Sequence, residues 1–130
     1  MEADILADVQ PTEEWRSVKK AIRQLFPGIA LALENEKLKG STQDMEVFKE
    51  KLEKQRIRDS TRAHIMDRLQ GNKAVFFLNK QAAFQGKINI TEENCILGPI
   101  QITLRSDDFD EDIQKLTATG KKELDHLEGR

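Results

Sequence analysis

The side chains best suited to recognition chemistry lie in a basic segment, residues 49–87. This segment holds ten Lys or Arg residues and four Asp or Glu residues, a net charge of +6. Because the whole chain carries −2, the remaining residues carry −8, and charge is strongly segregated along the sequence. Such a concentration of cations favours an anionic partner, above all nucleic acid.

One group of side chains in this segment is rich in arginine. Arg58 and Arg62 are four residues apart, as on one face of a helix, and Arg56 precedes them. If Asp59 or Ser60 caps a helix here, its free backbone amides lie beside the arginines and could bind a phosphate. We therefore predict phosphate contacts for the three arginines. The alternative is a charged helix face that is only solvated.

A second group consists of Asn79, Lys80 and Gln81, one cation between two amides. They follow the apolar run 74–78, and a buried strand there would hold them rigidly. Amides can reach bases or riboses, and an ammonium group can reach a phosphate. Lys87 offers one more cation. The alternative is structural, because an amide pair can equally well tie down a turn.

Catalytic and metal-binding chemistry have less support. Asp4 and Asp8 would share one face of a strand, but no histidine or nucleophile is placed to cooperate with them. The acidic run 107–112 lacks the glycine turn and ligand spacing of a calcium loop. The single cysteine, Cys95, and the two histidines, His64 and His126, are too few ligands for a zinc site. We expect no enzyme, no cofactor and no metal; a metal-dependent nuclease built on these acids is the least favoured class.

Hydrophobic periodicity predicts the elements that position these residues. Residues 3–9 alternate as a strand, residues 12–26 form a helix capped by Thr12, and residues 29–33 form a second strand. Because a helix joins them, the two strands could pair in parallel. A turn at Lys39 and Gly40 then leads to a capping box at Ser41 and Asp44, which starts the next helix. A bend near residues 56–59 separates that helix from another, which ends near residue 69.

Three strands follow, over residues 74–78, 88–91 and 100–105. The first is apolar at every position, which predicts cover on both faces of the sheet, whereas the other two alternate and need cover on one. Only one of Phe76 and Phe77 could point to the open face. We expect that face to be small, polar and mildly basic, formed by Ala30, Ala32, Lys87, Asn89, Thr91, Gln101, Thr103 and Arg105.

The order is thus β-α-β-α-α-β-β-β, an α+β fold with a mixed, largely antiparallel sheet and helices packed on one face. Residues 1–116 form a single domain, in which Phe109, Ile113 and Leu116 offer a short docking helix or turn, and residues 117–130 form a loosely held tail. No apolar run approaches the roughly 20 residues that span a bilayer, and the first residues carry acids where a signal peptide carries lysines. We therefore expect a cytoplasmic protein without a membrane partner.

Four stretches resemble a small archaeal family of uncharacterised proteins labelled predicted RNA-binding. They are Ala-Asp-Val-Gln-Pro-Thr-Glu (7–13), Lys-Gln-Arg-Ile-Arg-Asp-Ser-Thr-Arg (54–62), Phe-Leu-Asn-Lys-Gln-Ala-Ala-Phe-Gln-Gly-Lys-Ile (77–88) and Leu-Gly-Pro-Ile (97–100). The resemblance implies an archaeal cytosol and an α+β fold similar to that of a ribosomal protein that contacts ribosomal RNA on the large subunit. By position, it implies motif residues at Arg56, Asp59, Arg62, Asn79, Lys80 and Gln81. The chain departs from the family pattern at Arg58, Ser60 and Thr61, where a more apolar stretch is expected.

The sequence therefore predicts a non-catalytic RNA-binding protein that contacts structured or ribosomal RNA through residues 49–87. The predicted contacts are Arg56, Arg58, Arg62, Asn79, Lys80, Gln81 and Lys87. The alternative is a module that binds protein or forms a homodimer, through the apolar strand 74–78 or the sheet face, with no nucleic-acid role.

Overall fold

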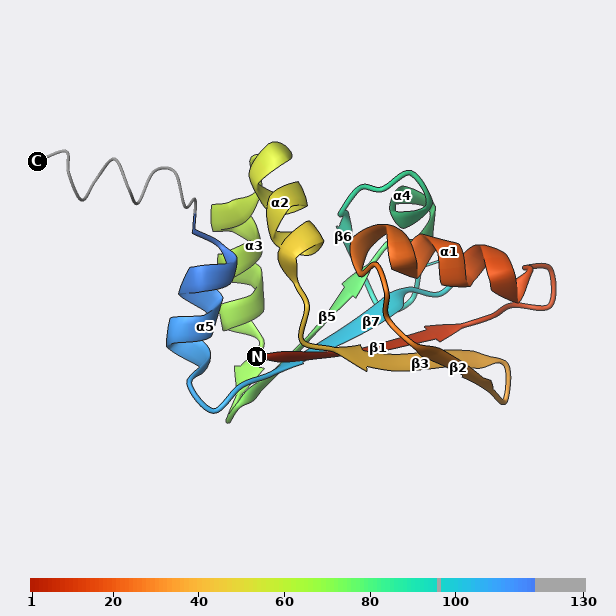
Figure 1. Ribbon diagram of the computed structural model, residues 1–130, viewed down its shortest axis with the longest axis horizontal. Helices are drawn as coiled ribbons and strands as arrows, with labels where there is room; N and C mark the ends of the chain where they lie inside the picture. The colour runs from red at the N-terminus through yellow and green to blue at the C-terminus, as the bar shows by residue number, and fades with distance from the viewer. Residues whose placement is uncertain (96, 119–130) are drawn as a thin grey trace, which may run out of the picture.

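The computed structural model describes residues 1–95 and 97–118, and it places the helices on one side of a single sheet (Figure 1). The helices are α1 (Trp15–Leu25), α2 (Glu46–Lys54), α3 (Arg58–Asp67), α4 (Lys80–Phe84) and α5 (Phe109–Leu116). The strands are β1 (Glu2–Asp8), β2 (Leu31–Glu34), β3 (Lys37–Thr42), β4 (Leu69–Gln70), β5 (Lys73–Leu78), β6 (Ile90–Thr91) and β7 (Ile100–Arg105). Their order in the sheet is β2-β3-β1-β7-β5-β4, with β6 paired to β5.

This architecture confirms the predicted α+β class and the order of the predicted elements. The structure adds β3, β4 and α4 to that order. Of the docking helix or turn predicted at Phe109, Ile113 and Leu116, it forms the helix, α5. Among the described residues, no helix is both long enough and apolar enough to cross a membrane.

The pairing of β2 differs from the prediction. Every pairing between described strands is antiparallel, and β2 pairs with β3 rather than in parallel with β1. Asn35 and Glu36 form the loop between them, with φ of 50° and 64°. Two left-handed residues make the tight hairpin turn that matches strand twist. The hairpin places Lys39 and Gly40 inside β3, so the turn predicted there is wrong.

Two of the predicted helix caps are also wrong. Helix α1 begins at Trp15, beyond Thr12, and helix α2 begins at Glu46. Ser41 lies in β3, where its hydroxyl donates to Oδ1 of Asp4 at 2.7 Å. A capping pattern acts through neighbouring amides, but pairing of β3 with β1 takes this stretch of backbone into the sheet.

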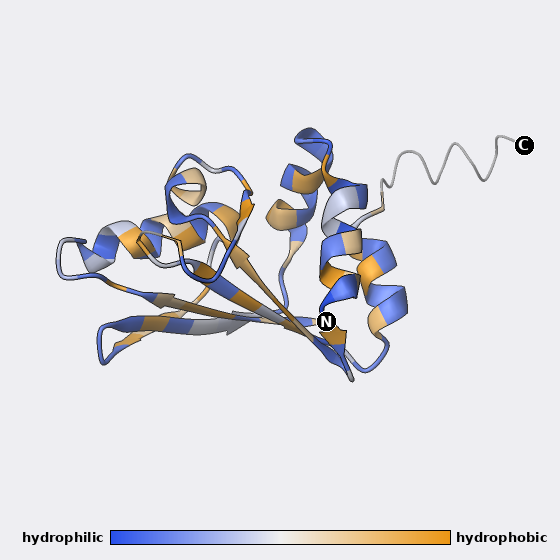
Figure 2. Ribbon diagram, turned by 180° about the vertical axis from the view of Figure 1, so that it is seen from behind, coloured by the Kyte–Doolittle hydropathy of each residue, from blue (hydrophilic) through white to orange (hydrophobic). Residues whose placement is uncertain are grey.

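The core lies between the sheet and the helix layer. Alternate residues of the central strands face the helices, namely Ala3, Ile5, Ala7, Ala74, Phe76, Leu78, Ile100, Ile102 and Leu104. The ring of Phe48 stacks on Phe26 at 5.4 Å between centroids and tilts against Phe76 at 6.4 Å. Burying each such ring stabilises the fold by about 1.5 to 3 kcal/mol. Figure 2 shows hydrophobic and hydrophilic residues alternating along the strands and the helices, the pattern of elements that are buried on one side.

The opposite face of the sheet carries no described helix (Figure 1). Phe77 and Val75 of β5 point to this face and are half-buried, so the predicted cover on both faces of the strand is wrong. The face does include Ala32, Thr91, Gln101, Thr103 and Arg105. However, Lys87 and Asn89 lie outside the strands, and β1 adds Glu2, Asp4 and Asp8, so the face is not basic.

The end of the domain is held at α5. Thr117 is buried, and its hydroxyl donates to the carbonyl of Ile113 at 2.7 Å. Of the tail predicted over residues 117–130, residues 119–130 lie outside the described residues, so that prediction stays a prediction.

Candidate nucleic-acid interface

The predicted contacts occupy separate parts of the helix side of the molecule. Arg56 and Arg58 lie at the junction of α2 and α3, and Arg62 lies further along α3. Asn79, Lys80 and Gln81 form the start of α4, and Lys87 follows that helix. The structure therefore does not gather all seven residues into one site.

The junction of α2 and α3 confirms the predicted bend. Arg56 sits between the helices with a φ of 59°, a left-handed conformation that is uncommon outside glycine. Beside it, Gln55 holds the junction in place with its side-chain amide. Its Nε2 donates to the carbonyl of Ile88 at 2.9 Å, and its Oε1 accepts from the amide of Ile88 at 2.8 Å. The junction is thus anchored to the segment that leads into β6.

The first turn of α3 leaves backbone donors unpaired within the described part of the chain. The helix begins at Arg58 without a side-chain cap, so the predicted capping role of Asp59 or Ser60 is wrong. Thr61 donates to the carbonyl of Ile57 at 2.9 Å, whereas the amides of residues 58–60 have no acceptor among the described residues. Free amides at the positive end of a helix attract anions.

These donors border an open hollow of about 480 Å³, lined by Glu53, Arg56, Arg58, Asp59 and Ser60. Arg56 is exposed and Arg58 is half-buried. The Nε atom of Arg58 is out of contact with solvent and has no hydrogen-bond partner in the described chain. The hollow thus combines two guanidinium groups with free amides, and the carboxylates of Glu53 and Asp59 oppose their charge.

Arg62 has a structural role in this conformation. Its Nη2 donates to Oδ1 of Asp59 at 3.0 Å, and its Nη1 donates to the hydroxyl of Thr117 at 3.3 Å. The side chain therefore ties α3 to the end of α5. A phosphate contact would compete with both bonds.

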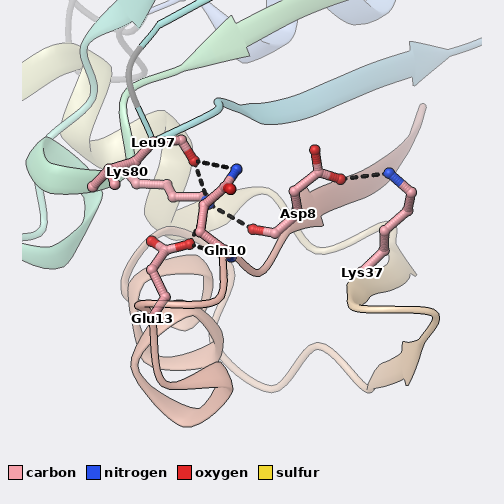
Figure 3. Close-up of polar contacts among 6 residues, drawn as sticks. All are labelled: Asp8, Gln10, Glu13, Lys37, Lys80 and Leu97. Atoms are coloured by element: carbon pink, nitrogen blue, oxygen red, sulfur yellow. Dashed lines mark hydrogen bonds and ion pairs between the residues drawn. The ribbon is translucent and has the colours of Figure 1, made fainter.

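Lys80 is buried rather than presented to a partner, and its ammonium group lies among Asp8, Glu13 and Leu97 (Figure 3). Only 1% of its side chain is exposed, against 11% for its ion-pair partner Glu13. The ammonium group donates to Oε1 of Glu13 at 2.9 Å, to the carbonyl of Leu97 at 2.9 Å and to the carbonyl of Asp8. Since an ammonium group has three hydrogens, none is left for a phosphate. The predicted phosphate contact of Lys80 therefore cannot form in this conformation.

The two neighbouring amides differ from each other. Oδ1 of Asn79 accepts from the amide of Ala82 at 2.9 Å and caps α4, which is the structural alternative for this residue. Gln81 is exposed, beside an open hollow of about 320 Å³ that Asn94 and Leu97 also line. Gln81 is thus the member of this group that remains available to a ligand.

Helix α1 carries cations that the charge of residues 49–87 did not reveal. Its eleven residues include no acid, and they include Arg16, Lys19, Lys20 and Arg23. Arg16, Lys20 and Arg23 are exposed, opposite the face that is buried against the sheet. A charge count made helix by helix, rather than over one window, would have found them in the sequence.

Helix α1 and Lys51 of α2 both reach the turn after α4. Nε2 of Gln24 donates to the carbonyl of Phe84 at 3.3 Å, which joins α1 to the end of α4. At Gly86, a Cβ atom would lie 3.2 Å from Nζ of Lys51 and 3.7 Å from Oε1 of Gln24. We call the combined region the helix-side basic surface and define it as Arg16, Lys19, Lys20, Arg23, Lys51, Lys54, Arg56, Arg58 and Lys87.

The open sheet face has a different electrostatic character, because three of its cations, Lys37, Lys39 and Arg105, are paired with acids, and only Lys73 is not among the described ion pairs. Nε of Arg105 donates to Oδ2 of Asp4 at 2.7 Å, and its Nη2 donates to Oε1 of Glu2 at 2.8 Å. The bond from Arg105 holds the pKa of Asp4 below its ordinary value of 3.8, although burial opposes this shift. Lys37 pairs with Asp8 in the same way. Phosphates would have to displace these carboxylates.

Comparison with known proteins links the chain to an archaeal group. Residues 2–106 match a family model described as RNA binding. The UPF0201 protein of Methanothermobacter thermautotrophicus is 33% identical over 106 residues, which cover 79% of this chain and 80% of that protein. A UPF0200/UPF0201 protein of Archaeoglobus fulgidus is 37% identical over 81% of this chain, but the chain spans only 33% of that relative's length.

Solved structures show the same fold. The crystal structure of an uncharacterized UPF0201 protein superposes with a TM-score of 0.82 at 33% identity, covering 88% of this chain and 91% of that one. The UPF0201 protein of Methanococcus jannaschii superposes with a TM-score of 0.81 at 32% identity, covering 92% and 96%.

Proposed function

We propose that this protein binds structured RNA without catalysing a reaction. The chain belongs to the archaeal UPF0201 family, and its residues 2–106 match a family model described as RNA binding. Within that family role, the helix-side basic surface is the proposed contact. The predicted likeness to a ribosomal protein of the large subunit, and with it a ribosomal RNA target, is part of the proposal.

The observation that carries the proposal is the hollow at the junction of α2 and α3. Arg56 and Arg58 provide guanidinium groups there, and the first turn of α3 provides amides without acceptors. Guanidinium and amide donors are the groups that contact phosphate oxygens in protein–nucleic acid complexes. Gln55 fixes the junction, so these donors are held in place before a ligand arrives.

Of the remaining predicted residues, some extend the RNA contact and others only support the surface. Lys87 and Lys54 are exposed and extend the contact to further phosphates, and Gln81 can reach a base or a ribose. Asn79, Lys80 and Arg62 support the surface from within, because their polar atoms already bond to the protein.

A salt series with labelled RNA tests the proposal. Fluorescence anisotropy with archaeal ribosomal RNA fragments should give an affinity that falls with salt. If four phosphates are neutralised, log affinity changes with log salt at a slope of roughly −3. The double variant Arg56→Glu, Arg58→Glu should weaken binding about tenfold or more, with a shallower slope, because two phosphate contacts become repulsive.

The matched control is Lys39→Glu, which reverses an exposed charge on the open sheet face. It should leave RNA affinity unchanged. Weak binding without salt dependence, or equal losses from the control and the double variant, would overturn the proposal.

A second candidate function is supported by the open sheet face. Leu6 and Phe77 both pair with Gln101, so the two apolar side chains flank it on a face that no described element covers. An apolar patch of this kind fits a protein partner or a second copy of the chain.

A further inference from the structure

We propose that Trp15, together with Arg16 and Lys19, forms a stacking site for an unpaired RNA base at the start of α1. The inference rests on the proposed RNA-binding function and names the part of the RNA that this end of the helix-side basic surface would recognise.

The indole ring of Trp15 is partly open to water and has two cations beside it. Trp15 is the first residue of α1 and is half-buried, with one part of the indole against the core and the rest open to water. The guanidinium carbon of Arg16 lies 4.8 Å from the centre of the ring, and Nζ of Lys19 lies 5.5 Å from it. Both cations are within the range of a cation–π contact.

The positive charges of this cluster are not neutralised by a described ion pair. Two cations gather at one ring, yet neither is ion-paired with a described acid. The carboxylate of Glu13, close in sequence, is occupied by Lys80. Two neighbouring positive charges repel each other, so a phosphate beside them would be bound favourably.

The indole of Trp15 and the guanidinium group of Arg16 are both flat. An indole ring stacks well on a nucleobase, and the planar guanidinium of Arg16 can extend the stack. In a duplex the bases are stacked on each other and covered, whereas in loops and bulges they can be splayed onto an aromatic side chain. The combination of an indole with two phosphate-binding cations therefore fits an unpaired nucleotide.

Cations further along α1 could contact the nucleotides that follow the stacked one. Lys20 and Arg23 follow Arg16 at spacings of four and three residues, which places the three on one exposed stripe of the helix. This stripe leads from Trp15 toward the part of the surface where Lys51 lies. Glu14 is exposed next to Trp15 and opposes an anion there.

The fluorescence of Trp15 can report directly on binding at the proposed site. Trp15 is the one tryptophan, and there is no tyrosine. Its fluorescence therefore reports on the proposed site alone. We would titrate the unmodified protein with an RNA hairpin that has an unpaired loop and with a fully paired RNA duplex, and follow binding in parallel by anisotropy of the labelled RNA. The hairpin should quench the fluorescence in step with binding, and the duplex should bind without quenching.

Variants test the same site by affinity. Trp15→Leu should weaken binding of the hairpin by roughly 5- to 150-fold, the range for one stacked base, and should leave duplex binding unchanged. Trp15→Phe retains an aromatic ring and should lose less. Glu14→Gln should strengthen binding of both RNAs slightly, because it removes an opposing charge. Thermal unfolding of each variant checks that the fold is intact.

The outcomes separate this inference from the proposed function. Binding of the hairpin without quenching, together with an unaffected Trp15→Leu variant, would overturn the stacking site and leave RNA binding in place. Equal quenching by hairpin and duplex would overturn the preference for an unpaired base. Failure of both RNAs to bind at low salt would overturn the proposed function and the stacking site together.

Discussion

The ammonium group of Lys80 lies almost entirely out of water, with 1% of the side chain exposed. Removing a charge from water costs several kcal/mol, and good geometry with further hydrogen bonds is needed to offset that cost. Glu13 supplies the opposite charge, and the carbonyls of Asp8 and Leu97 accept the other two hydrogens. The residue thereby holds the end of β1 and the residues before α1 against α4 (Figure 3).

Replacing Lys80 should therefore destabilise the fold strongly. In Lys80→Met, the carboxylate of Glu13 stays largely buried without its partner, and we expect the free energy of unfolding to fall by about 3 to 5 kcal/mol. Urea unfolding followed by circular dichroism measures this. The control Lys87→Met removes an exposed ammonium and should change stability by less than about 0.5 kcal/mol. Similar effects of the two substitutions would contradict the role given to Lys80.

At the scale of elements, the hairpin of β2 and β3 depends on a close backbone approach at Gly40. A Cβ atom at this position would lie 2.5 Å from the carbonyl oxygen of Ala30 and 2.8 Å from Cδ2 of Leu31. Backbone cannot give way as a flexible side chain can. Gly40 also pairs with Ile5 of β1, so a shift here would disturb the register of the sheet.

We expect Gly40→Ala to lower the free energy of unfolding by about 1 to 3 kcal/mol, because the added methyl group is overpacked. The neighbouring substitution Lys39→Ala, on the open face, is the control and should be nearly neutral. Thermal unfolding of both variants measures the difference. If Gly40→Ala unfolds at the same temperature as the unmodified protein, the contact with Ala30 is not a constraint on the hairpin.

At the scale of the whole molecule, the two faces differ in the charge they leave available. On the sheet face, Arg105 and Lys37 are bonded to the carboxylates of β1. On the helix side, α1 carries cations with no acid within the helix, and the junction of α2 and α3 adds Arg56 and Arg58. The sheet face instead leaves Leu6 and Phe77 partly exposed. Under the two candidate functions, an RNA would therefore bind the helix side and a protein partner would bind the sheet face.

Phe77→Lys distinguishes the two sides. If RNA binds the helix side, the variant should keep its RNA affinity to within about twofold, because the change is on the other face. Light scattering on the same samples reports the oligomeric state. A concentration-independent dimer that Phe77→Lys disrupts would favour the protein-interaction alternative, and a large loss of RNA affinity would contradict the assignment of RNA to the helix side.

Hydrophobic periodicity is a local property, so the class of fold and the positions of most elements can be predicted from the order of residues alone. The strands over 3–9, 74–78 and 100–105 and the bend near 56–59 follow from it. It did not reveal the hairpin turn at Asn35 and Glu36, where no glycine marks the left-handed residues.

Which cations face solvent depends instead on how the chain packs. Lys80 meets its partners Asp8, Glu13 and Leu97 across separations of 72, 67 and 17 residues, and no local pattern encodes such contacts. The same holds for the adjacency of Lys51, Gln24 and Gly86, which come from three segments. Pairing of distant segments buried Lys80, the one cation of the Asn79-Lys80-Gln81 group, and brought Lys51 of α2 beside the residues that join α1 to α4. Burial and proximity are set by packing and not by the order of residues.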